Sequence, residues 1–121
     1  MNKRYKSVYA KIENQHELNS KVAKLISEGN VIGWFQGRSE FGPRALGNRS
    51  ILADPRNINM QKKLNLKIKY REGFRPFAPS VLEEDYKLFF EGDLETPYML
   101  LVKNVAKSTL KSIPNNYNDL N

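Results

Sequence analysis

The feature that most constrains the fold is a stretch rich in arginine and turn-forming residues, GRSEFGPRALGNRSILADPR, at residues 37–56. Its 20 residues include four arginines, three glycines and two prolines, and it follows the apolar run NVIGWFQ at residues 30–36. Glycine and proline interrupt helices and strands, so the chain has to bend here. We therefore predict a short strand at residues 30–36, buried on both faces, and a second strand at residues 49–54.

The remaining elements follow from the spacing of apolar residues and from capping residues. A helix over residues 14–29 is predicted, with Asn14 as its N-cap and Gly29 just past its end. Two further helices and two further strands are predicted at residues 57–67, 83–90, 77–84 and 97–105. The order αββαβαβ indicates a mixed α/β protein.

Length and composition bound the organisation of the chain. A chain of 121 residues allows one domain or part of one. We expect a lead-in segment at residues 1–13, the domain at residues 14–106 and a flexible polar tail at residues 107–121. There is no cysteine, and a single histidine argues against a histidine metal site. No apolar run approaches the roughly 20 residues of a membrane span, and we expect a cytoplasmic protein.

The positive charge of the chain is concentrated in one segment. The net charge is +7, and the residues from Arg38 to Arg75 contain ten Lys or Arg against three acidic residues. This segment therefore carries the whole excess, because the remaining ten basic and ten acidic residues cancel. A local excess of this kind indicates an anionic partner.

The glycine-rich loop offers several groups that bind anions. Glycines allow close approach of the backbone to a ligand, and Pro43 is expected to begin a short helical turn through Leu46 with free N–H groups. Arg44 and Arg49 add guanidinium groups, whose planar geometry matches phosphate oxygens. The alternative is a charged surface loop without a ligand.

A second basic cluster lies in KIKYREGFRPFAPS at residues 67–80. On an extended segment, Lys69 and Arg71 would project from the same face, and Arg75 follows them. If this segment lies beside the first loop, the basic residues of both surround one polyanion such as a triphosphate. Scattered surface charge is the alternative.

Other polar residues of the segment are assigned structural roles. Glu40 lies among arginines and is predicted to be their partner rather than a general base. Asp54, which precedes a proline, is predicted to form a turn. Ser39 and Ser50 have no histidine in the motif, which argues against a serine nucleophile.

The stretches GWFQGRSEFGPRALGNRSILADPR, LNLKIKYREGFRPFAPSVLEEDY and PYMLLV resemble the C-terminal domain of the carbamoyltransferases that act on nodulation factors and antibiotics. The resemblance spans about residues 22–105 and implies a YrdC-like α/β fold, an open twisted mixed sheet with helices and a basic cavity. It implies that carbamoyl phosphate and ATP form carbamoyl-adenylate, and that a separate N-terminal transfer domain moves the carbamoyl group to a hydroxyl. ATP would be accompanied by Mg²⁺, and Fe²⁺ would belong only to the transfer domain.

The resemblance also assigns site residues by motif match. It implies that five residues bind carbamoyl phosphate and the phosphates of ATP, namely Arg44, Arg49, Lys69, Arg71 and Arg75. All of these except Arg71 are also expected to act in catalysis. Family members usually continue past Ile113–Pro114, so we expect an incomplete domain that is weakly active or inactive alone. Two other functions are alternatives to carbamoyl-adenylate formation: the chain is a nucleic-acid-binding module, or it is a non-catalytic remnant used for docking or for forming homodimers.

Overall fold

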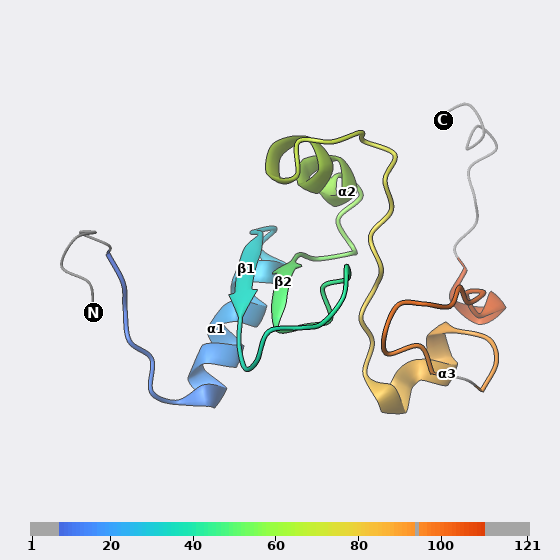
Figure 1. Cartoon of the computed structure of the whole chain (residues 1–121), viewed down its shortest axis with the longest axis horizontal. Coiled ribbons are helices and arrows are strands. Elements are labelled where there is room, and N and C mark those ends of the chain that lie inside the picture. The colour runs from blue at the N-terminus through green and yellow to red at the C-terminus, as the bar shows by residue number, and fades with distance from the viewer. Residues whose placement is uncertain (1–7, 94, 111–121) are drawn as a thin grey trace.

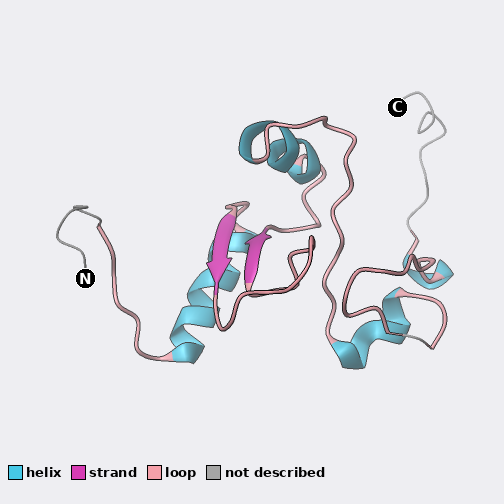
Figure 2. Cartoon of the chain, viewed as in Figure 1, coloured by secondary structure: helices cyan, strands magenta, loops and turns pink. Residues whose placement is uncertain are grey.

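The computed structural model of this chain describes residues 8–93 and 95–110, and it combines helices with one small sheet (Figure 1; Figure 2). The regular elements in chain order are α1 (Gln15–Ser27), β1 (Ile32–Phe35), β2 (Arg49–Leu52), α2 (Met60–Lys63), a π-helical turn (Leu64–Ile68), a 3-10 turn (Glu83–Asp85), α3 (Tyr86–Phe89) and a second 3-10 turn (Lys107–Thr109). The mixture of α and β elements that we predicted is confirmed. The sheet is smaller than predicted, and the YrdC-like fold is not confirmed. The predicted lead-in and tail fall partly outside the described residues.

Helix α1 has the caps that the sequence predicted. The Asn14 side chain accepts hydrogen bonds from the backbone N–H groups of His16 (2.8 Å) and Glu17 (3.2 Å). The N–H groups in the first turn of a helix have no carbonyl partner within the helix, so this side chain satisfies two of them. At the other end Gly29 has a φ of +83°, and the N–H groups of Gly29 and Asn30 donate to carbonyls of the last turn. Local capping therefore sets both ends of this helix.

Strands β1 and β2 form an antiparallel pair in which Ile32 lies opposite Leu52 and Phe35 opposite Arg49. Helix α1 packs against β1, so one face of the sheet is covered. Ile32 and Trp34 are half-buried, whereas Gly33 and Phe35 are exposed. The prediction that the first strand is buried on both faces is therefore wrong. The alternation is that of a sheet covered on one side.

The second predicted helix begins at Met60 rather than near residue 57, and it changes type along its length. After α2 the helix widens into the π-helical turn, where the Lys69 N–H donates to the Leu64 carbonyl (2.9 Å). Met60 and Leu64 are buried, and Asn65 has no exposed surface. Among the described residues, all of the buried side chains except that of Asp54 therefore lie on this helix.

The predicted strands at residues 77–84 and 97–105 are not formed. Residues 75–82 have no regular secondary structure (Figure 2), and Pro76 and Pro79 lack the N–H donors of a strand ladder. In the range 97–105, Met99 has a φ of +54°, which turns the chain. The only β-pairing of this range within the described residues is an isolated bridge between Phe90 and Val105. The short helix predicted at residues 83–90 is confirmed.

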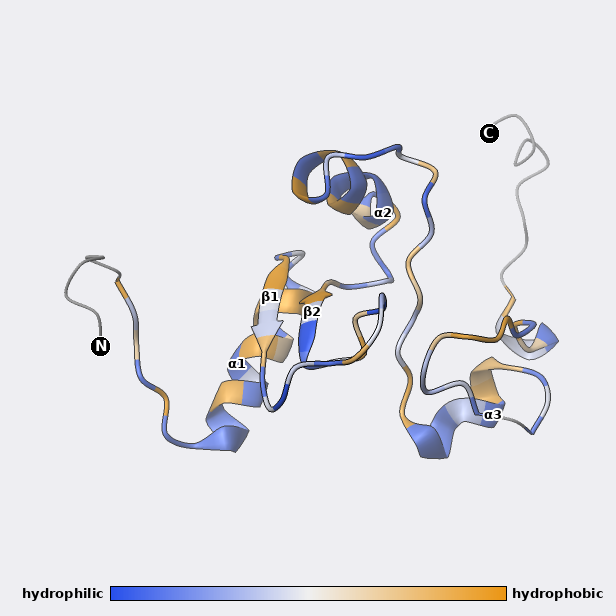
Figure 3. Cartoon of the chain, in the orientation of Figure 1, coloured by the Kyte–Doolittle hydropathy of each residue, from blue (hydrophilic) through white to orange (hydrophobic). Residues whose placement is uncertain are grey.

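Much apolar surface is open to solvent. The chain exposes 11,260 Å², whereas a compact monomer of this mass is expected to expose roughly 6,700 Å². Figure 3 shows hydrophobic residues along β1, α1 and the chain beyond α3. Large exposed apolar residues after α3 include Tyr98, Leu100, Leu101 and Val102. None of the described helices has the length and apolar character needed to cross a membrane.

Candidate anion-binding site

The loop between β1 and β2 is organised by the carboxylate of Glu40. Its Oε1 atom accepts hydrogen bonds from the backbone N–H groups of Leu46 and Asn48, both at 2.8 Å. Gly42 and Gly47 take φ angles of +103° and +114°, which glycine adopts without steric cost. The predicted helical turn from residue 43 to residue 46 is wrong, because residues 42–44 form bends and the Leu46 N–H donates to the Glu40 side chain. Glu40 is a structural residue, as predicted, but its partners are backbone groups rather than arginines.

Arg49, the first residue of β2, closes the same loop. Its Nη1 atom donates to the carbonyl oxygens of Gln36 (2.5 Å) and Asn48 (2.9 Å), and its Nη2 atom donates to that of Gly37 (3.3 Å). The Cζ atom lies 3.4 Å from the ring centroid of Phe35, its partner across the sheet. This guanidinium is therefore engaged by loop carbonyls and by an aromatic face.

Arg44 differs from Arg49 in its surroundings. Both side chains line a shallow hollow of about 290 Å³, whose other lining residues are Ser39, Glu40, Gly42, Pro43 and Ala45. Arg44 is exposed, and within the described residues no hydrogen bond or ion pair engages its side chain. The structure thus brings two predicted residues to one hollow, and Arg44 is the one whose guanidinium is wholly unengaged within the described residues.

The second predicted cluster follows the π-helical turn. Tyr70 has a φ of +48°, so the chain turns sharply between Lys69 and Arg71, and the predicted extended segment is wrong at this point. Arg71 Nε donates to Asn65 Oδ1 (2.7 Å), and its Cζ atom lies 4.9 Å from the ring centroid of Phe77. Lys69 is exposed at the end of the helix.

Arg75 lies at the end of this cluster and forms an ion pair with Glu72. The Arg75 Nε atom lies 3.3 Å from Glu72 Oε2, and both side chains are about half exposed. The backbone N–H of Glu72 itself, followed by the Arg75 guanidinium, lowers the pKa of the Glu72 carboxyl below its ordinary value. An exposed pair of this kind is easily exchanged for another anion.

The two basic clusters are built separately. In residues 8–93 and 95–110, the hydrogen bonds and ion pairs of each cluster join it to its own loop or supporting helix, and none joins Arg44 or Arg49 to Lys69, Arg71 or Arg75. The convergence of all five residues on one polyanion stays a prediction.

Two features of the site were not anticipated from the sequence. Asn65 is fully buried and holds the second cluster. An asparagine flanked by leucines in a helical pattern is the signal in the sequence that could have predicted this role.

The second feature is the pair of Asp54 and Arg56. Arg56 donates from Nε and Nη2 to both carboxylate oxygens of Asp54, which is 7% exposed. These hydrogen bonds lower the pKa of Asp54 from 3.8 to about 2. The Asp54 carboxylate also accepts from the Arg56 backbone N–H, so its predicted turn-forming role is confirmed.

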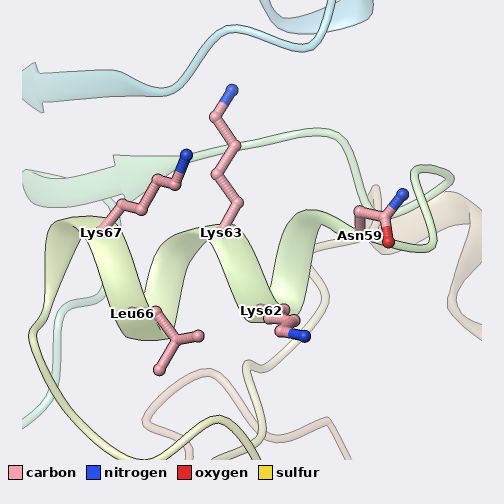
Figure 4. A pocket seen from close by; sticks show the side chains of 5 residues that line it. All are labelled: Asn59, Lys62, Lys63, Leu66 and Lys67. Atoms are coloured by element: carbon pink, nitrogen blue, oxygen red, sulfur yellow. The ribbon is translucent and has the colours of Figure 1, made fainter.

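A second hollow, of about 320 Å³, lies along α2 and the π-helical turn. It is lined by Asn59, Lys62, Lys63, Leu66 and Lys67. Figure 4 shows that Lys63 and Lys67 project to one side of the helix and Lys62 and Leu66 to the other. The Lys63 ammonium donates to the Gly29 carbonyl (2.7 Å), which ties this helix to the end of α1. Because Lys62 projects away from Lys63 and Lys67, the three lysines do not converge on one anion.

The chain is similar in sequence to a known protein family, and the matched residues include both basic loops. Residues 23–118 match the family described as carbamoyltransferase C-terminus. The chain is 62% identical over 94 residues to an uncharacterized protein of Synechocystis, covering 78% of this chain and 15% of that protein. It is 54% identical over 103 residues to nodulation protein NolNO of Sinorhizobium fredii, covering 83% and 15%. With the 3′-hydroxymethylcephem-O-carbamoyltransferase of Amycolatopsis lactamdurans it shares 43% identity over 91 residues, covering 75% and 17%. The resemblance that the motifs carry is confirmed.

Proposed function

Because this chain belongs to the carbamoyltransferase C-terminal family, we propose that it binds carbamoyl phosphate and ATP and contributes to the formation of carbamoyl-adenylate. In the balanced reaction, one water is consumed as phosphate leaves carbamoyl phosphate. A carbamate oxygen then bonds to the α-phosphorus of ATP, and pyrophosphate leaves. The carbamoyl group subsequently passes to a hydroxyl acceptor, and AMP is released. The observation that carries this proposal is the family match, since residues 23–118 include both basic loops.

The chemistry of the loops supports binding of phosphate groups. Arg44 presents unengaged N–H donors beside a hollow, and Arg71 and Lys69 add positive charge in the second cluster. Positive charge placed near a leaving pyrophosphate stabilises the negative charge that develops in the transition state. Positioning and charge neutralisation are sufficient for this step, so no side-chain nucleophile is required. Mg²⁺ would accompany the triphosphate of ATP.

The partner that we propose is the remainder of a longer carbamoyltransferase. The chain spans only about 15% of the length of the first relatives that it matches. The exposed apolar residues beyond α3 are suited to packing against such a partner, because large exposed apolar patches mark interaction surfaces. Acceptor recognition and carbamoyl transfer would belong to that remainder.

Titration calorimetry of this chain with ATP and carbamoyl phosphate, separately and together, tests the proposal. We expect saturable binding that weakens by about tenfold or more in Arg44→Ala and in Lys69→Ala, because a hydrogen bond to a charged group contributes about 1.5–3 kcal/mol. Lys24→Ala on α1 is the matched control, since Lys24 lies outside both basic loops. In a full-length protein that carries this sequence, both site variants should lose carbamoyl phosphate-dependent ATP–pyrophosphate exchange.

Wild-type binding or exchange in both site variants would contradict the proposal. The salt dependence of binding separates it from nucleic-acid recognition. A nucleic-acid interface loses affinity steeply with salt because many phosphate contacts release counterions, whereas a nucleotide site has a modest slope.

A further inference from the structure

Asn65 connects the helix to the second basic cluster through every polar atom of its side chain. Its Oδ1 atom accepts a hydrogen bond from Arg71 Nε (2.7 Å), and its Nδ2 atom donates to the carbonyls of Gly73 (3.1 Å) and Arg75 (2.8 Å). Its own carbonyl accepts from the Arg71 backbone N–H (3.0 Å). With 0% exposure, this amide is buried at a cost that only full pairing offsets.

The end of the helix explains why Asn65 reaches the loop. The π-helical turn closes at Lys69, and Tyr70 then takes a left-handed conformation with a φ of +48°. The following residues therefore run back over the helix end. Gln61, on the preceding turn, adds donors to the carbonyls of Phe74 (3.3 Å) and Arg75 (3.2 Å). Two amide side chains thus fasten one loop to one helix.

This arrangement orients the Arg71 guanidinium without neutralising it. Asn65 engages the Nε edge, and the Phe77 ring lies 4.9 Å from Arg71 Cζ. Within residues 8–93 and 95–110, the Nη1 and Nη2 atoms of Arg71 donate no hydrogen bond. Because the asparagine amide is uncharged and no ion pair engages Arg71 within the described residues, its guanidinium is available to an anion, whereas the Arg75 guanidinium is paired with the Glu72 carboxylate.

We propose that Asn65 is a positioning residue, which holds the Arg71 guanidinium and the backbone of residues 71–75 so that the terminal nitrogens of Arg71 face a phosphate group of the ligand. This inference rests on the proposed function, because it takes the ligand to be ATP or carbamoyl phosphate. Titrations with each compound alone show which of the two Arg71 contacts.

The central test is a double-mutant cycle of Asn65→Ala and Arg71→Ala, with affinity measured by calorimetry. If Asn65 positions Arg71 for the ligand, Asn65→Ala should weaken binding by about tenfold, and by no more than Arg71→Ala does. If Asn65 acts through Arg71, adding Asn65→Ala to Arg71→Ala should weaken binding by no more than about twofold further. The Arg71 Nε–H should give a slowly exchanging NMR signal in the wild type and lose it in Asn65→Ala.

Two more variants keep the test decisive if Asn65→Ala does not fold. Gln61→Ala releases the same loop from an exposed position, and we expect a several-fold loss of affinity. Asn59→Ala is the matched control, because within the described residues the Asn59 side chain has no hydrogen bond to this loop. Asn59→Ala should bind as the wild type does.

Each outcome supports or overturns a distinct claim. Wild-type affinity in Arg71→Ala would remove Arg71 from the proposed function, and the positioning role would fall with it. Weakened Arg71→Ala together with wild-type affinity in folded Asn65→Ala would overturn the positioning role alone. Additive losses in the double mutant, or wild-type affinity in Gln61→Ala when Asn65→Ala is unfolded, would also overturn it.

Discussion

The two basic loops of this protein differ in the side chains that hold their arginines. In the loop after β1, Glu40 accepts from two backbone N–H groups and Arg49 donates to three carbonyls. Neutral side chains add three further hydrogen bonds to this loop. In the loop after the π-helical turn, the neutral amides of Asn65 and Gln61 make the contacts to the helix and leave the terminal nitrogens of Arg71 available. An arginine that closes its own loop has fewer donors for a ligand than one oriented by an amide. Arg44 and Arg71 are therefore stronger candidates for phosphate contacts than Arg49.

Apart from substitutions of the buried residues Met60, Leu64 and Asn65, the largest loss of stability is expected for Arg49→Ala. The substitution removes three hydrogen bonds from a charged donor, and we expect a loss of about 1–3 kcal/mol in the free energy of unfolding. Urea unfolding followed by circular dichroism measures it. Arg38→Ala is the matched control, an exposed arginine of the same loop. If both variants unfold at the same urea concentration, charged groups do not hold this loop.

An intermediate effect is expected from acid. The Arg56 hydrogen bonds lower the pKa of Asp54 to about 2 from 3.8, so the Asp54 carboxylate binds protons more weakly in the folded state. Its contribution to stability is therefore fully present above about pH 4–5 and is lost as the pH falls through 2. The free energy of unfolding of the wild type and of Asp54→Asn, measured between pH 5 and pH 2, gives this contribution of the carboxylate.

The acid response should also differ between the two loops. Asp54→Asn should be less stable at pH 5 and should lose less stability on acidification than the wild type. Part of the acid sensitivity should persist, because the pKa of Glu72 in the second loop is also lowered. Identical pH profiles of wild type and variant would show that the Asp54 contacts with Arg56 do not stabilise the fold.

The smallest effect on stability is expected for Arg44→Ala. Its side chain is exposed and unengaged in the described residues, so the free energy of unfolding should change by less than about 0.5 kcal/mol. The same variant is expected to lose ligand affinity, which separates a binding arginine from a structural one. A destabilisation as large as that of Arg49→Ala would erase the distinction between these two arginines.

Local signals in the sequence were sufficient for several features. Asn14 and Gly29 marked the ends of α1 because a cap acts on its neighbouring backbone groups. The turn-forming residues 37–48 separate two strands, as expected. Strand predictions at residues 77–84 and 97–105 failed because apolar composition does not supply a pairing partner. Pro79 lacks the donor a ladder needs, and Met99 turns the chain.

Family membership, the concentration of positive charge and the identity of the basic residues follow from the order of amino acids, because motifs and charges are properties of the chain itself. The role of each arginine follows from its neighbours in space. Whether Arg49 bonds its own loop, or Asn65 lies close enough to orient Arg71, depends on distances between residues that are far apart along the chain or separated by a turn. Hydrogen bonds form only within such short distances, so the folded arrangement assigns these roles.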